Sequence, residues 1–533
     1  MCEAKAYARL DELERCRQAE QRAIERAMPE VYRRRWGQFA TPPGLATAIL
    51  RTCRQVLGEA GLVRFLDPGG GTGVFFRALL EVFGPRRVNS AVSYEVLPVV
   101  AAAARRLWSD LGLQVRCEDF TRARPECNGQ KRPNLIVCNP PYSRHHGLSR
   151  ETKVRLGRRT TELTGVEVDG LAGLHVYFML LADQWLDEGG LGAWLIPSET
   201  LDVNYGAAIR RYLSSRVSLV RIHRFPPTSV QFDQALVSSC VILFRKERPH
   251  PSDIATLTWG ADLEAPDQVH RLSIDQLCGA PKWGKLMATS PELGARTAGT
   301  GDLTIGDLFQ VRRGIATGAN RFFVLERQHA AELELPAAFL RPILPSPRYI
   351  EADVVEADEE QWPLVEPSLA LLNCDLPRRQ VERDYPSLEA YLVSGERMGL
   401  HQRYLLSRRS PWYRQETRPP APLLCTYMAR RKLGTRTFRF IRNRSDAIAL
   451  NVYLMMYPKR VLQAAGAFEA GLLDRVHDAL RQLSDAACVR EGREYGGGLH
   501  KLEPSELCRL PVPLADEDRR LLARADQLVL PGL

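Results

Sequence analysis

The most constraining stretch of this sequence is a short apolar run that passes directly into a glycine-rich loop. Residues 63–66 (Val-Arg-Phe-Leu) are β-prone, and Asp67-Pro-Gly-Gly-Gly-Thr-Gly follows them before a helical pattern over 74–83. Glycines allow a tight turn and let the backbone approach a ligand closely. A strand, a glycine loop and a helix in this order predict the opening of a nucleotide-binding βαβ unit. The chain is therefore expected to contain an α/β domain with a Rossmann-like sheet.

Two further predicted strands end in acidic residues. Residues 91–94 run into Glu95, and residues 113–116 run into Glu118-Asp119-Phe120. In such sheets an acid at the end of the second strand takes the two hydroxyls of a ribose. A glycine loop with a ribose-binding acid fits NAD, FAD and S-adenosylmethionine alike, so these residues leave the cofactor open.

The fourth predicted strand, residues 135–138, ends in Asn139-Pro140-Pro141-Tyr142. The Asn139 side-chain carbonyl and the Pro140 carbonyl can accept both protons of an exocyclic amino group, and Tyr142 offers a flat face for stacking. The alternative is a strand that ends in a Pro-Pro turn with a buried tyrosine. Hydride transfer has no use for an amino-group clamp, whereas methyl transfer to an amine does. The combination with the glycine loop therefore favours S-adenosylmethionine.

Composition sets outer limits on the class of protein. The 533 residues suffice for two or three domains, and 73 Lys and Arg against 63 Asp and Glu give a net charge of +10, which permits nucleic-acid binding without proving it. The 12 cysteines include no C-x-x-C pair, so neither a metal site nor a disulfide framework is predicted. No apolar run approaches a membrane span, and no signal peptide is recognised. A cytoplasmic protein is expected.

Composition shifts along the chain predict four segments. Residues 1–36 form a helical extension, 37–250 the cofactor-binding domain, 251–300 a proline-rich linker and 301–533 a mixed α+β domain. Thr41 is expected to cap a helix, because prolines follow it. A polar and basic stretch between Ser143 and Gly173 is expected to be a long functional loop.

The C-terminal domain contains a strongly basic stretch over 401–444. Its arginines alternate with aromatic residues, and Glu416 is an isolated acid among the arginines. Such a mixture suits a surface that contacts phosphates and stacks on bases, although an arginine-rich solvated face has the same composition. Arg408 and Arg431 of this stretch, with Arg313 ahead of it, are predicted to bind DNA.

These patterns occur in an order that resembles a known family. Phe39-x-Thr-Pro, the glycine loop, Glu95, Asp119-Phe120 and Asn139-Pro-Pro-Tyr resemble the amino-methylating DNA methyltransferases of the γ arrangement, of which the TaqI-like adenine-N6 methylases are the model. The chain is most similar in style to the larger type II modification methylases of the PstI, BsuBI, SalI and XamI kind. Residues 313–323 and 495–504 resemble the opening and closing segments of their recognition domain.

The resemblance implies roles for individual positions. Asn139, Pro140 and Tyr142 would be catalytic, with Phe232 as a second aromatic that encloses a flipped-out base. Thr41 and Pro42, with Phe39 of the same pattern, would contact the methionine end of S-adenosylmethionine. The remaining cofactor contacts would be Asp67, Gly69, Gly71 and Gly73 at its amino acid moiety, Glu95 at the ribose, and Asp119 and Phe120 at the adenine.

The resemblance implies a site-specific DNA adenine-N6 methyltransferase of a type II restriction-modification system. Double-stranded DNA would be its substrate, a separate restriction endonuclease its functional partner, and the chain a monomer. Three alternatives remain at this point: cytosine-N4 methylation, methylation of RNA or of a protein glutamine, and a DNA-binding specificity subunit with a vestigial methylase domain. The Asn at the head of the catalytic pattern favours adenine, and the large basic C-terminal domain favours DNA.

Overall fold

The computed structural model describes residues 2–28, 39–126, 131–143, 147–226, 229, 231, 238–280, 282–287, 303–430, 436–495 and 499–528. The chain divides into two compact units, Met1–Pro291 with Tyr495–Gly498 (the N-terminal unit) and Glu292–Glu494 with Leu499–Leu533 (the C-terminal unit). Within these described ranges, no helix is both long and apolar enough to cross a membrane.

A nine-stranded mixed sheet organises the N-terminal unit, in the order β3-β2-β1-β4-β5-β7-β6-β8-β9. The strands from β3 to β5 are parallel, and β7 lies antiparallel between β5 and β6. This order confirms the predicted Rossmann-like sheet and brings the ends of β1, β2 and β4 to one edge. The strands are β1 (Val63–Asp67), β2 (Val88–Tyr94), β3 (Leu113–Arg116), β4 (Leu135–Cys138), β5 (Leu191–Pro197), β6 (Ser218–Arg224), β7 (Ser239–Arg245), β8 (Ile254–Trp259) and β9 (Gln268–Ser273).

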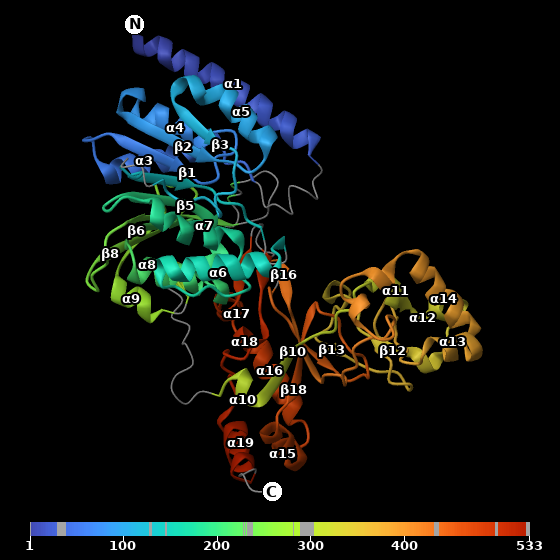
Figure 1. Ribbon diagram of the computed structural model, residues 1–533. Helices are drawn as coiled ribbons and strands as arrows, with labels where there is room; N and C mark the ends of the chain where they lie inside the picture. Colours follow the sequence, from blue (N-terminus) through green and yellow to red (C-terminus); the bar gives the residue numbers. More distant parts are fainter. Residues whose placement is uncertain are drawn as a thin grey trace. The chain divides into compact units, whose positions relative to one another are not determined.

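Helices cover both faces of this sheet, and neighbouring residues of its central strands enter different cores. Phe65 packs with α3, α4 and α5, whereas Leu66 packs with the core of α6, α7, α8 and α9. Because both faces are buried, the central strands are apolar almost throughout. Figure 1 shows the helices around the sheet: α3 (Pro43–Leu57), α4 (Val74–Phe83), α5 (Pro98–Trp108), α6 (Arg150–Thr164), α7 (Leu174–Ala182), α8 (Ala207–Ser215) and α9 (Ile274–Gly279).

The first helix, α1 (Cys2–Ala27), is part of the N-terminal unit and not a separate extension. Leu10 is buried in the core of α3, α4 and α5, and Glu20 pairs with Arg106 of α5 at 2.9 Å. In Figure 1, α1 runs beside α5. The sequence predicted an extension over 1–36 because α1 is mostly charged, so its narrow buried face gives a weak periodic signal.

Two segments of this unit correct the sequence-based expectations. Much of the predicted linker over 251–300 is ordered structure, since β8 pairs with β6, β9 pairs with β8, and α9 follows. The predicted loop between Ser143 and Gly173 contains α6, which begins at the N-cap Ser149 and ends at Gly165 in the left-handed conformation. Its few buried residues, among them Leu156, make it polar enough to be mistaken for a loop.

The C-terminal unit is a mixed α+β domain, as predicted. Its main sheet has the order β10-β18-β15-β17-β13 and separates two hydrophobic cores. A second sheet has the order β11-β14-β12 and a third β16-β20-β19. The strands are β10 (Phe309–Arg313), β11 (Val324–Glu326), β12 (Leu340–Ile343), β13 (Val354–Val355), β14 (Leu369–Leu372), β15 (Leu423–Thr426), β16 (Met428–Arg430), β17 (Phe440–Asn443), β18 (Tyr453–Pro458), β19 (Arg493–Tyr495) and β20 (Leu499–Lys501).

The helices of the C-terminal unit are mostly short. They are α10 (Ile305–Leu308), α11 (Asn320–Phe323), α12 (Arg327–Glu332), α13 (Arg378–Asp384), α14 (Pro386–Arg397), α15 (Arg460–Phe468), α16 (Leu472–Gln482), α17 (Asp485–Glu491), α18 (Pro504–Leu507) and α19 (Asp516–Leu528).

Candidate cofactor and catalytic site

A cavity of about 500 Å³ opens at the edge where β1, β2 and β4 end. This is where an open α/β sheet binds its ligands. Nine of the residues predicted from the sequence line the cavity: Phe39, Thr41, Gly69, Gly71, Glu95, Asp119, Phe120, Asn139 and Pro140. Four others do not line it, namely Pro42, Asp67, Gly73 and Tyr142. Phe232 lies outside the described residues.

The glycine loop after β1 is held by hydrogen bonds and by one buried indole. The Gly70 amide donates to the Tyr94 carbonyl at 2.9 Å, which ties the loop to the end of β2. Gly73 has φ +91°, and a Cβ on it would lie 2.5 Å from Nε1 of Trp108. The same Nε1 donates to the Thr72 carbonyl at 2.8 Å. Trp108 therefore shapes the loop from α5, a role that its place at a helix end gave no reason to predict.

Two buried carboxyl groups lie beneath and beside the loop. Asp67 accepts a bond from the Gly69 amide at 3.0 Å, and burial raises its pKa to about 7. Glu95 accepts a bond from the Leu97 amide at 2.8 Å, and burial raises its pKa as well. Asp67 braces the loop without lining the cavity, whereas Glu95 lines it.

Asp119 and Phe120 form the wall that follows β3. The Asp119 carboxylate accepts bonds from the Thr121 amide and hydroxyl, at 2.9 and 2.8 Å. Phe120 is only 2 % exposed and packs against Tyr94 and Trp185, with ring centroids 5.5 Å from Tyr94. This aromatic wall offers an apolar face to a planar ring.

Asn139 has one side of its amide engaged and the other free. Its Nδ2 donates to the Phe39 carbonyl at 2.9 Å and to Thr41 Oγ1 at 3.0 Å. Its Oδ1 is buried and has no hydrogen-bond partner in the described part of the chain. A buried acceptor without a partner costs about 1–3 kcal/mol, so an unpaired Oδ1 indicates a ligand that supplies the donor.

Thr41 therefore has a different task from the one expected of it. Pro42 is the N-cap residue of α3, and no side chain caps this helix end. The predicted cap at Thr41 is wrong because its hydroxyl is occupied by Asn139. The contact links the Phe39-x-Thr-Pro pattern to the catalytic pattern about a hundred residues later, which sequence spacing could not reveal.

Tyr142 is fixed on three sides. Its hydroxyl donates to the Leu195 carbonyl of β5 at 3.1 Å. Its ring lies 5.9 Å from that of Phe39 and 6.3 Å from that of His175, measured between centroids. Burial lowers the pKa of His175 to about 4, so this imidazole is neutral at physiological pH. Tyr142 is held as a rigid aromatic surface beside Asn139.

The structure separates the arginines of the predicted DNA-binding surface into those that stack on aromatic rings and those that are bonded within the fold. The Arg313 guanidinium stacks on Tyr427 at 4.2 Å, and that of Arg408 stacks on the exposed Tyr404 at 4.0 Å. Arg431 lies outside the described residues. Many other arginines of the basic stretch are engaged in ion pairs or with backbone carbonyls: Arg409, Arg418, Arg439, Arg442 and Arg444.

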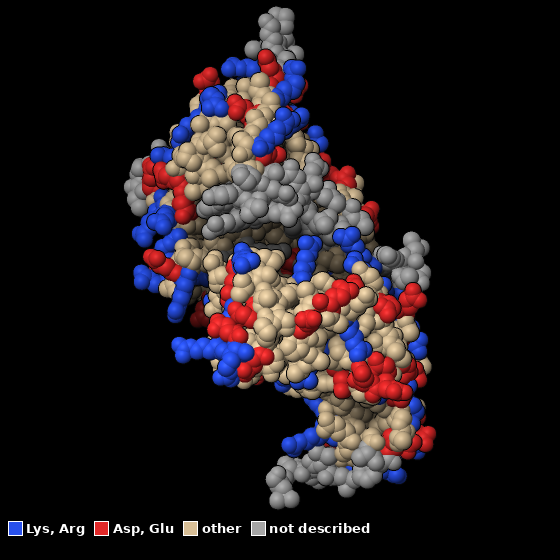
Figure 2. Space-filling model, turned by 90° about the vertical axis from the view of Figure 1, so that its right-hand side faces the viewer, with Lys and Arg blue, Asp and Glu red and all other residues tan. Residues whose placement is uncertain are grey.

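Most of the interleaved aromatic residues are not available for stacking. Tyr413, Tyr427, Phe438 and Phe440 are each at most 3 % exposed. The expectation that they form a stacking surface is wrong, because they fill the cores on either side of the main sheet. On the face shown in Figure 2, Lys and Arg are interspersed with Asp and Glu and do not form one continuous basic field.

The fold and the site define a class of protein. A sheet of this order, with a glycine loop after β1 and Asn-Pro-Pro-Tyr after β4, is that of a Rossmann-like methyltransferase. Within the described ranges no group of three or more His, Cys, Asp or Glu side chains could hold a metal ion.

Comparison with known proteins narrows the class. Residues 109–231 match the family model of the Eco57I restriction-modification methylase, and residues 282–531 match that of the type II methyltransferase M.Eco57I, C-terminal domain. The type II methyltransferase M.XamI of Xanthomonas campestris pv. amaranthicola is 29% identical over 467 residues, which are 84% of this chain and 80% of M.XamI. M.AccI of Acinetobacter calcoaceticus is 25% identical over 506 residues, covering 91% and 87%. These matches support a type II DNA methyltransferase, as the resemblance implied.

Solved structures agree at the level of the fold. The type IIL restriction-modification enzyme MmeI in complex with DNA matches with a TM-score of 0.56 at 13% identity, over 95% of this chain and 73% of that one. The DrdV–DNA complex matches with a TM-score of 0.54 at 12% identity, over 97% of this chain. The chain spans only 59% of DrdV, so that protein contains substantial further sequence.

Proposed function

We propose that this chain transfers a methyl group from S-adenosylmethionine to the N6 amino group of an adenine in double-stranded DNA. The adenine would be flipped out of the duplex into the cavity beside Asn139. The modification would protect the DNA from a separate restriction endonuclease of the same specificity, with the methyltransferase acting as a monomer in the cytoplasm.

The observation that carries this proposal is the half-satisfied amide of Asn139. Because Phe39 and Thr41 engage Nδ2, the buried Oδ1 of this cavity-lining residue is left as an acceptor without a partner among the described residues. The Pro140 carbonyl follows directly in the chain, and Pro140 lines the cavity too. An exocyclic amino group offers two protons to these two acceptors, and binding them turns the nitrogen lone pair toward an electrophile.

The residues around the cavity fit S-adenosylmethionine. The glycine loop leaves room for close backbone approach, Glu95 suits ribose hydroxyls, and Phe120 suits the adenine of the cofactor. When bound, the cofactor supplies a sulfonium methyl group as the electrophile. The site's own task would be to hold and orient the amino nitrogen for attack on that methyl group.

The reaction needs no strong base in the site. A carbon–nitrogen bond forms as the carbon–sulfur bond breaks, and the proton that the nitrogen must lose passes to water after transfer. Asn139 Oδ1 and the Pro140 carbonyl orient the nitrogen, and Tyr142 gives the base a face on which to stack. This accounts for a site led by an asparagine, with a neutral His175 behind Tyr142.

The proposal is tested by incubating the purified protein with labelled S-adenosylmethionine and unmethylated genomic DNA. The modified nucleoside is then identified by mass. N6-methyladenine is the expected product. Label on cytosine N4 would retain the enzyme class but overturn the adenine assignment. Label on RNA or protein, with DNA unlabelled, would overturn the DNA substrate.

Substituting Thr41 by valine tests how Asn139 is positioned. Valine keeps the shape of threonine but removes the Oγ1 acceptor, so Nδ2 retains only the Phe39 carbonyl and the amide can rotate. We expect kcat to fall about tenfold, because a small misplacement of the amine reduces in-line attack. The matched control is Thr47→Val, which removes a hydroxyl of α3 that bonds Glu81 away from the cavity. An equal loss of kcat in both variants would show that Thr41 acts only through stability.

A further inference from the structure

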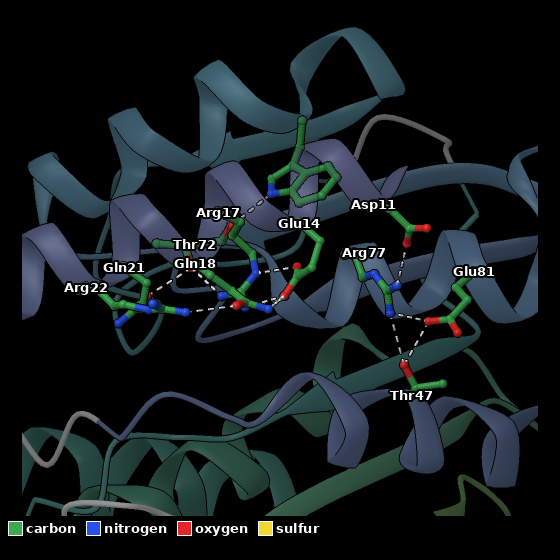
Figure 3. A network of polar contacts seen from close by, with 11 residues as sticks. Asp11, Glu14, Arg17, Gln18, Gln21, Arg22, Thr47, Thr72, Arg77 and Glu81 are labelled. Carbon is green, nitrogen blue, oxygen red and sulfur yellow. Dashed lines mark hydrogen bonds and ion pairs between the residues drawn. The ribbon is translucent and has the colours of Figure 1, made fainter. Parts of the chain in front are cut away.

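One face of α1 carries a continuous chain of polar contacts. Glu14, Arg17, Gln21 and Glu25 are spaced by three or four residues, so they lie on the same side of the helix. Arg17 donates to both oxygens of Glu14 at 2.7 Å, and Gln21 Nε2 donates to Glu25 Oε1 at 2.8 Å. In Figure 3, Arg17 and Gln21 of this face reach Thr72 of the glycine loop.

Thr72 is the point where α1 meets the glycine loop. Arg17 Nη1 donates to Thr72 Oγ1 at 3.0 Å, and Thr72 Oγ1 donates to Gln21 Oε1 at 2.9 Å. Because the Thr72 carbonyl accepts the bond from Trp108, this residue is held on both its side chain and its backbone. Arg17 is 3 % exposed, although it is a charged residue of a helix at the surface. Arg17 can therefore stabilise the glycine loop only while α1 remains packed on the rest of the N-terminal unit.

Docking is provided by contacts along the length of α1. Asp11 pairs with Arg77 of α4 at 3.5 Å, and Arg77 also contacts Glu81 and Thr47 (Figure 3). Glu20 pairs with Arg106 of α5 at 2.9 Å. These contacts bring the last two turns of the helix over the cavity, where Gln21, Glu25 and Met28 line it.

Glu25 is the last residue in this series of polar contacts along α1. Gln21 Nε2 donates to its Oε1, and no cation of the described residues pairs with the Glu25 carboxylate. Acids outnumber cations along the cavity, since Glu25, Glu95, Glu118 and Asp119 line it against Arg17, Arg122 and Arg155. Arg17 pairs with Glu14, Arg122 pairs with Asp119, and Arg155 donates to Thr121. A ligand with positive charge is thereby favoured. S-adenosylmethionine carries a sulfonium and an ammonium group against one carboxylate.

We propose that α1 forms one wall of the cofactor site and that Glu25 binds the α-ammonium group of the cofactor's methionine end. The order of the strands in the sheet supports the assignment of Glu25 to the methionine end of the cofactor. Phe120 lies after β3, Glu95 after β2 and the glycine loop after β1, so adenine, ribose and methionine follow one another toward Asn139 after β4. The loop that α1 contacts is the one at the methionine end.

This inference rests on S-adenosylmethionine being the cofactor, and its test separates the two claims. Full-length protein and the variant Glu25→Gln are titrated calorimetrically with S-adenosylhomocysteine and with 5′-methylthioadenosine, which lacks the amino acid moiety. We expect the substitution to raise the Kd of S-adenosylhomocysteine about tenfold, the order of one charge-assisted hydrogen bond that is partly exposed. The Kd of methylthioadenosine should change less than twofold.

The matched control is Glu20→Gln, which removes the same charge from the same helix outside the cavity and breaks an exposed ion pair with Arg106. It should leave both dissociation constants unchanged. Equal affinity of Glu25→Gln and native protein for S-adenosylhomocysteine would overturn the role of Glu25, as would equal weakening of both ligands, or weakening in the control as well. Failure of the native protein to bind S-adenosylhomocysteine would overturn the cofactor assignment itself.

Discussion

Replacement of Asn139 by alanine should lower kcat about a thousandfold while the Kd of S-adenosylhomocysteine stays within twofold of the native value. Alanine removes Oδ1, the acceptor that has no partner in the described structure, so the target amino group loses its orientation. The cofactor contacts assigned to Glu95, the glycine loop and Phe120 are untouched. Loss should therefore appear in the chemical step and not in cofactor binding.

The measurement is a single-turnover methylation assay together with calorimetric binding of S-adenosylhomocysteine. Alanine removes the desolvation cost of Oδ1 but also the two bonds from Nδ2 to Phe39 and Thr41, so the unfolding free energy should fall by about 1 kcal/mol. A loss of kcat smaller than tenfold would show that the Pro140 carbonyl alone orients the amine. A parallel loss of cofactor affinity would mean that Asn139 serves the cofactor rather than the substrate.

Much of this site could be predicted because its signals are local. Each strand end is a short apolar run followed by a residue with distinctive chemistry, as in the glycine loop after β1 and the Asn-Pro-Pro-Tyr turn after β4. Buried parallel strands are apolar on both faces, so they stand out from the sequence around them. The order of these signals along the chain then predicts which strand ends share an edge of the sheet.

The parts that could not be predicted depend on contacts between distant residues. Thr41 gives no local sign that it holds Asn139, because the partner lies about a hundred residues away. Both α1 and α6 bury narrow faces, so their sequences are polar enough to resemble an extension and a loop. Arg408 and Arg439 look alike in a basic stretch, yet Arg439 pairs with Asp353, which only the fold brings near it. Composition cannot distinguish an arginine of the surface from one that binds the fold together.

The second large effect is expected for Gly73→Ala. At φ +91° an alanine costs about 1 kcal/mol of strain, and its Cβ would lie 2.5 Å from Nε1 and 2.6 Å from Cδ1 of Trp108. Trp108 is fully buried, so it cannot move without disturbing the core, and overpacking of this kind costs about a further 1–3 kcal/mol. Any relief of the clash breaks the bond from Trp108 to the Thr72 carbonyl. The glycine loop should then lose its shape and cofactor affinity should fall more than tenfold.

The control for Gly73→Ala is Gly112→Ala, because Gly112 has a similar left-handed conformation (φ +94°, ψ 11°) but no atom lies within 4 Å of the Cβ it would acquire. Gly112 directly precedes β3 and lies outside the cavity. Urea titration should therefore give a loss of about 1 kcal/mol in the unfolding free energy for Gly112→Ala and about 2–4 kcal/mol for Gly73→Ala. Only the second variant should bind S-adenosylhomocysteine more weakly. If the two variants lose the same stability and both keep their affinity, Trp108 does not shape the loop. If Gly73→Ala is as stable as the control but binds S-adenosylhomocysteine weakly, the glycine loop changes conformation while the Trp108 indole stays in place.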